Sequence, residues 1–192
     1  MITREAALEL LEAQGVDATL RTHCLMSEAV LRGLAAHLGE DPELWGLTGL
    51  PHDVDCPQTR DTPMQHGLRG QTLLAGHLPP EACAASATHN DAMNGSSPPS
   101  TLLDWALRCG ESVTGLVAAT ALVRPARMEG MKPKSLKKKM KVRSFAANVD
   151  RDIIAECVHL QLVLATFLQI AIDTITPIAD QVGLGVPAKE AP

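Results

Sequence analysis

Residues 22–53 read THCLMSEAVLRGLAAHLGEDPELWGLTGLPHD and contain two helical patterns joined by a short turn. The first pattern predicts a helix over residues 21–38 that ends at Gly39. The second begins at Asp41, which is followed by a proline at the first helical position. Because the connection is short, the two helices are expected to pack as antiparallel neighbours. His23 would then lie at the same end of the pair as His52 and Asp53.

The remainder of the chain also shows helical patterns. Apolar residues recur at helical spacing over residues 5–13, 62–76, 101–123 and 151–175, and a short helix from Glu81 leads to His89. The stretch NDAMNGSSPPS after His89 has the composition of a loop. No segment alternates apolar and polar residues as a half-buried strand does. The sequence therefore predicts a single all-α domain over residues 1–192.

The composition excludes several classes of partner. Aromatic residues make up only 2% of the chain, too few for stacking on single-stranded nucleic acid, and the formal net charge of −5 disfavours duplex binding. The five cysteines include no CxxC pair, so neither a zinc knuckle nor a disulfide framework is indicated. The longest apolar stretch, LQLVLATFLQIAI, is shorter than a membrane span. We therefore expect a cytoplasmic protein that binds neither nucleic acid nor membranes.

The histidines form the strongest candidate for chemistry. The adjacent pair His52 and Asp53 offers a neutral nitrogen ligand and a carboxylate at one position, and single histidines stand at His23, His66 and His89. If each helix or turn returns to the same end of the bundle, these residues can bind one or two divalent metals. The other histidines are expected to be ordinary surface or core residues: His37, His77 and His159.

This pattern resembles the HD-domain superfamily of metal-dependent phosphohydrolases, which is named for its His-Asp doublet. Besides residues 22–50, the segments DTPMQHGLRGQTLL around His66 and ATHND around His89 are similar to small bacterial members. The likeness covers about residues 20–120. Residues 121–183 resemble a helical extension of such members, and a short flexible tail is expected after them.

The resemblance implies an all-α helical bundle with a mononuclear or binuclear metal centre. His23, His52 and Asp53 would be the core ligands, His66 and His89 would complete a second metal position, and Asp53 would bridge the two ions. The implied cofactor is one or two divalent ions of Mn, Fe, Ni, Mg or Zn. His52 and Asp53 would be the catalytic residues.

The chain departs from the family pattern at two positions. Glu111 stands where the family usually has an aspartate as the last metal ligand, with Asp104 as a second candidate, and Pro51 precedes the doublet in place of an apolar residue. A proline inside a helix removes a hydrogen-bond donor and can change the direction of His52. Asp55, in the polar run after the doublet, lines a substrate entrance, orients a ligand or belongs to a plain loop.

The resulting functional hypothesis is hydrolysis of a phosphate ester or anhydride in a small, nucleotide-like molecule. Arg124 and the basic segment 132–143, with Lys132 and Lys134, are candidates for binding the phosphate, although this segment can also be a solvated face. Two alternatives stay open. One is a di-iron oxygenase on the same scaffold, and the other is a non-catalytic binding or regulatory protein. A homodimer through the apolar C-terminal helix is a further candidate.

Overall fold

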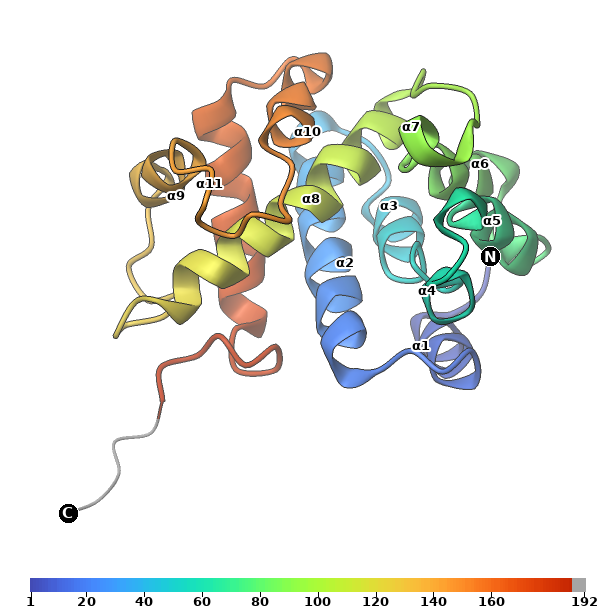
Figure 1. The fold of residues 1–192 in the computed structure, drawn as a ribbon, viewed down its shortest axis with the longest axis horizontal. Coiled ribbons are helices and arrows are strands. Elements are labelled where there is room, and N and C mark those ends of the chain that lie inside the picture. The colour runs from blue at the N-terminus through green and yellow to red at the C-terminus, as the bar shows by residue number, and fades with distance from the viewer. Residues whose placement is uncertain (188–192) are drawn as a thin grey trace.

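Helix α2 (Ala18–Leu38) occupies the centre of the computed structural model, which describes residues 1–187. It packs against α3 (Pro42–Gly49), α8 (Leu102–Leu122) and α11 (Leu164–Ile175), and Figure 1 shows α8 crossing α2 with α11 and α3 on either side. The described residues contain no β-strand, and the fold is all-α as predicted. The other α-helices are α1 (Arg4–Ala13), α4 (Cys56–Thr59), α5 (Leu68–Leu74), α6 (Pro80–Thr88), α7 (Asp91–Asn94), α9 (Pro133–Met140) and α10 (Arg151–Ala155). Short 3-10 helices are η1 (Pro63–Gln65), η2 (Glu156–Leu160) and η3 (Thr176–Ile178).

Local capping signals produce the α2–α3 pair. Gly39 ends α2 in the left-handed region, and the side chain of Asp41 accepts hydrogen bonds from the first backbone amides of α3. The two helices approach closely at Gly49, where an added Cβ would lie only 3.0 Å from the backbone oxygen of Ser27. This close pairing confirms the predicted contact and directs the chain after α3 toward the start of α2.

Two predicted helices differ from the structure. The predicted helix over residues 62–76 is wrong, because the chain forms η1 and α5 with an extended His66 and a left-handed Gly67 between them. The predicted helix over 151–175 is also interrupted, since Gln161 has a φ of 58° and separates η2 from α11. The segments Arg151–Leu160 and Leu164–Ile178 meet at an angle of 101°.

Membrane spanning was tested on the described residues alone. No single helix among them combines the length and apolarity of a membrane span, although the bent pair just described passes on length and composition together. The helical extension predicted after residue 120 contains α9, α10, η2 and α11. The flexible tail predicted at the C-terminus falls partly on residues 188–192, which lie outside the described residues.

Candidate metal centre

Four histidines and one aspartate meet where α2, α3 and α6 converge. His23 comes from the second turn of α2, His52 and Asp53 from the turn after α3, His66 from the extended residue before α5, and His89 from the end of α6. The Nε2 atoms of His23 and His52 lie 3.2 Å apart, and those of His66 and His89 lie 3.1 Å apart. The structure thus brings these predicted ligands together.

Asp53 belongs to two groups of donor atoms. The first group is His23, His52 and Asp53, and the second is Asp53, His66 and His89. The Oδ2 atom of Asp53 lies 3.5 Å from Nε2 of His23, whereas Oδ1 lies 3.2 Å from Nε2 of His66. Oδ1 also lies 3.3 Å from Nε2 of His52, so the carboxylate of Asp53 lies between the two groups and is shared by both.

All four imidazoles are held at the nitrogen that faces away from Asp53. Nδ1 of His52 and Nδ1 of His89 donate to the backbone oxygens of Gly49 and Ser86, at 2.8 and 2.6 Å. For His23 the partner is the hydroxyl of Thr114, and for His66 it is Asp55. Because the Thr114 hydroxyl already donates to the backbone oxygen of Glu111, it accepts the hydrogen bond from Nδ1 of His23.

When the rings are neutral, this arrangement leaves each Nε2 as the acceptor side of its ring. In neutral imidazole, one nitrogen that donates leaves a lone pair on the other. Two lone pairs that face each other at 3.2 Å repel unless a cation or a proton lies between them. Two ligands each about 2.1 Å from one ion are roughly 3.0 to 3.4 Å apart at angles of about 90° to 110°. The donor spacings therefore fit divalent metal ions.

The pKa values of the centre reflect the burial and close spacing of its histidines and carboxylates. Burial lowers the pKa of His52 to about 3, so this side chain stays neutral. Burial opposes the ionised form of Asp53, but the surrounding histidines, His52 first, hold its pKa well below the ordinary value. Burial likewise disfavours protonated His66, yet hydrogen bonds to Asp53 and Asp55 outweigh it and raise the pKa of His66 to about 10. The buried carboxylates thus attract positive charge to this centre.

A family comparison agrees with this geometry. The model of the HD domain matches residues 20–140, well over half of the chain. The chain belongs to the HD-domain family. HD domains typically bind divalent metals, which agrees with the two donor groups around Asp53. Neither the comparison with curated proteins nor the comparison with solved structures gave a match.

In this HD domain the proline before the doublet lies outside the helix. Helix α3 ends at Gly49 with Leu50 as its cap, so Pro51 removes no helical hydrogen bond. The imidazole of His52 is fully buried and bonded to Gly49. The side chain of His52 is therefore directed at the centre despite Pro51.

Glu111 lies beside the first donor group on α8. Its Oε2 atom is 3.7 Å from Nε2 of His23, while its Oε1 atom accepts a 2.5 Å hydrogen bond from the Ser112 hydroxyl. Burial raises the pKa of Glu111. The second candidate, Asp104, instead caps α8, because its carboxylate accepts from the backbone amides of Ser100 and Thr101. Of the two acidic candidates on α8, Glu111 is therefore the one that lies beside His23.

The remaining predicted site residues lie farther away. Leu122 ends α8 about 16 Å along the helix from Glu111, and Arg124 follows it, donating to the backbone oxygen of Glu129. Lys132 and Lys134 are exposed at the start of α9. Their role in substrate binding stays a prediction. The other histidines are exposed and outside the centre: His37, His77 and His159.

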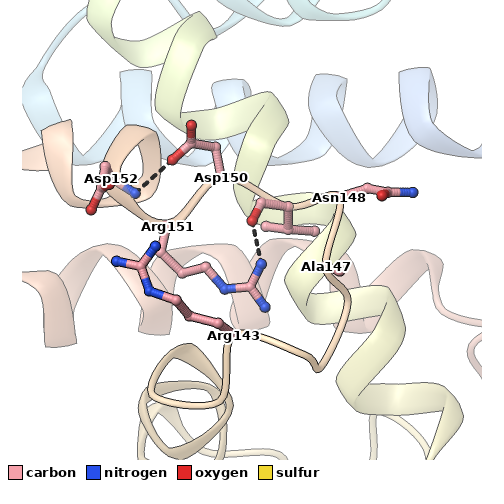
Figure 2. A pocket seen from close by; sticks show the side chains of 7 residues that line it. Arg143, Ala147, Asn148, Asp150, Arg151 and Asp152 are labelled. Carbon is pink, nitrogen blue, oxygen red and sulfur yellow. Dashed lines mark hydrogen bonds between the residues drawn. The ribbon is translucent and has the colours of Figure 1, made fainter.

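A cavity opens next to His23, and a second cavity adjoins the first. The first has a volume of about 310 Å³ and is lined by His23, Glu111, Ser112, Gly115 and the segment 148–150. The second, about 280 Å³, shares the segment 148–150 and is also lined by Arg143 and Arg151 (Figure 2). Arg151 donates to the backbone oxygens of Phe145, Ala146 and Val149 and so holds this loop in place.

The sequence pattern did not identify several residues that orient the histidines of the centre. Thr114, one turn after Glu111 on α8, had no distinguishing signal beyond that spacing. The backbone oxygen that holds His89 belongs to Ser86, and a backbone partner is not visible in side-chain patterns. Arg108, also on α8, donates to the backbone oxygen of His89 and to the carboxylate of Asp91. For Asp55, a role in orienting a ligand was only one of the alternatives that the sequence left open.

Proposed function

We propose that this HD-domain protein is a metal-dependent phosphohydrolase that cleaves a phosphate ester or anhydride of a small molecule. The observation that carries the proposal is the division of Asp53 between two donor groups beside an open cavity. Sites with two adjacent divalent ions support in-line displacement at phosphorus. Nucleotide-like compounds are the first substrates to test, and Mn, Fe, Ni, Mg and Zn are the candidate ions.

The side chains of the centre have separate tasks in this proposal. When bound, the cations supply Lewis acidity, which polarises phosphoryl oxygens and lowers the pKa of water. Asp53 and His52 would bind the ions. Because His52 is completely buried, bulk water does not reach the centre from the side of this imidazole. His23 and Glu111 face the cavity, where they are in reach of a substrate.

Basic residues near the centre would position the phosphate. Arg143 lines the cavity that adjoins the one beside His23 and Glu111, and it forms no ion pair with an acidic side chain of the described residues. Arg124, Lys132 and Lys134 are farther out, so in this proposal they attract an anionic substrate from solution. Replacing Arg143 with Gln should raise KM for phosphorylated substrates, whereas Lys132→Gln should mainly lower kcat/KM at low salt and so reduce its salt dependence.

The direct test compares the metal-loaded protein with an Asp53→Ala variant on a panel of phosphorylated compounds. Asp61→Ala is the matched control, because Asp61 is an exposed aspartate in the loop that follows the doublet. We expect phosphate release from the unaltered protein and from Asp61→Ala, with at least a thousandfold loss in Asp53→Ala. Equal rates in all three proteins, or no release in any of them, would contradict the proposal.

The same preparations test the two alternatives. Substrate-dependent oxygen uptake by protein purified without air, with phosphate release absent, would favour the di-iron oxygenase. Less than about one equivalent of metal per chain, with ligand binding retained, would favour the non-catalytic protein.

A further inference from the structure

An apolar groove leads away from the metal centre between α2 and α8. It has a volume of about 480 Å³ and begins at His23 and Gly115. The same two residues line the cavity that contains Glu111, so the groove and the metal cavity adjoin. An added Cβ at Gly115 would lie 2.9 Å from Cγ2 of Val149, and the absence of a side chain there leaves the junction clear.

The walls of the groove follow one stripe on each helix. From α8 come Thr114, Gly115, Ala118 and Leu122, which recur at helical spacing after Glu111. The groove runs about 10 Å along α8 between Gly115 and Leu122. It is closed by the segment 182–184, whose Val182 and Leu184 are buried, and by Met26 of α2.

The lining offers little to a polar ligand. Apart from His23, no charged or titratable side chain among residues 1–187 lines the groove. The hydroxyl of Thr22 donates to the backbone oxygen of Ala18, and that of Thr114 donates to the backbone oxygen of Glu111. Among the side chains of the described lining this leaves the hydroxyl of Thr19, at the exposed start of α2, as a donor for a ligand. A nucleobase placed here would leave most of its polar edge unpaired, which costs binding free energy. A hydrocarbon chain has no such groups.

We propose that the preferred substrate is an amphiphilic phosphate ester, with its phosphate at the metal centre and a hydrocarbon chain in this groove. The inference rests on the proposed function, because it assigns the substrate class of the same site. It also explains the exposed Leu122, which has 55% of its surface accessible at the far end of the groove. Burial of that side chain by the substrate would be favourable.

The test measures kcat/KM for a series from ethyl to octyl phosphate, at concentrations below those that form micelles. We expect about a fourfold rise for each methylene that becomes buried, followed by a plateau when the groove is full. A constant kcat/KM across the series, or a preference for nucleoside monophosphates over octyl phosphate, would overturn the proposal.

Two variants at adjacent exposed positions provide a matched comparison. Leu122→Glu places a carboxylate at the end of the groove, whereas Val123→Glu places it at a residue that is 58% exposed and outside the groove. Only Leu122→Glu should lower the ratio of octyl to ethyl phosphate kcat/KM, by about tenfold. Equal ratios in the two variants would count against the groove.

A binding measurement separates this inference from the proposed function. Alkyl phosphonates are not hydrolysed and share one headgroup, so the difference in affinity between two chain lengths for the metal-loaded protein reports on the groove. Tighter binding of octyl than of ethyl phosphonate, without hydrolysis of any ester, would retain the groove and reject the phosphohydrolase. Hydrolysis without any dependence on chain length would do the reverse.

Discussion

Asp55 places one carboxylate oxygen 3.0 Å from Nδ1 of His66 and gives the other to the backbone amides of Gly67 and Gly70. The side chain is completely buried, so these contacts take the place of the hydrogen bonds that water would otherwise donate to the carboxylate. A carboxylate that accepts from a metal-binding imidazole fixes the ring and increases its basicity as a ligand. This contact connects the loop after the doublet to the second donor group.

The first prediction concerns Asp55→Asn. Asparagine has a single side-chain oxygen, and the two backbone amides require it, so the amide nitrogen would face Nδ1 of His66. That contact favours a proton on Nε2, where His66 should bind the ion. We expect metal affinity to fall by about 10- to 100-fold, measured by competition with a chelator. Asp61→Asn is the control, and equal affinities in both variants would contradict the orienting role of Asp55.

The second prediction concerns pH. The pKa of His66 is raised from 6.5 to about 10 in the metal-free fold, so its proton stabilises that fold fully below pH 6.5. This contribution is lost as the pH rises from 6.5 toward 10. Because a metal requires neutral imidazole, binding at pH 8 should release about one proton. Calorimetry in buffers of different ionisation enthalpy measures this number. Zero released protons would contradict the prediction.

The third prediction concerns Arg108, whose guanidinium contacts Asp91 at 2.5 Å and Glu156 at 2.6 Å. The ion pairs are mostly buried, since only 11% of the Arg108 side chain is exposed. Arg108→Met would leave two carboxylates without a cation. We expect the free energy of unfolding to fall by about 3 kcal/mol in urea denaturation.

Arg60→Met is the comparison for Arg108. Arg60 is 71% exposed and lies 3.9 Å from Asp17, so its loss should cost under about 1 kcal/mol. Similar losses in the two variants would show that the Arg108 cluster does not stabilise the fold.

The fourth prediction compares two left-handed glycines. Gly67 has a φ of 83° and an added Cβ would lie 2.7 Å from the backbone oxygen of Ser86, whereas Gly76 has a φ of 82° with nothing within 4 Å. Gly76→Ala should therefore cost about 1 kcal/mol from backbone strain alone. Gly67→Ala adds a clash, and we expect a loss of about 3 kcal/mol. Thermal denaturation measures both, and equal losses would contradict the clash.

Local signals predicted much of the fold. Gly39 and Asp41 define the turn between α2 and α3 through interactions within a few residues, and Thr101 and Asp104 form the capping box of α8. These contacts are short-range, so the sequence predicts them well. Prediction from short-range signals fails around His66. There the next residue, Gly67, donates to Asp55 and lies close to the backbone oxygen of Ser86, and these tertiary contacts override the helical pattern. Gln161 interrupts the predicted C-terminal helix without any glycine or proline to indicate it.

The sequence by itself determined the all-α class, the α2–α3 pair and the family to which the ligands belong. Helical periodicity and short connections are local properties, and the family followed from the resemblance of the segments around His23, the His52-Asp53 doublet, His66 and His89. Only the tertiary structure decided that Asp53 lies between the two donor groups and which partner holds each imidazole. Thr114 comes within 2.9 Å of His23 only because α2 and α8, 91 residues apart at this contact, pack together, and Asp55 reaches His66 only because the loop between them folds back.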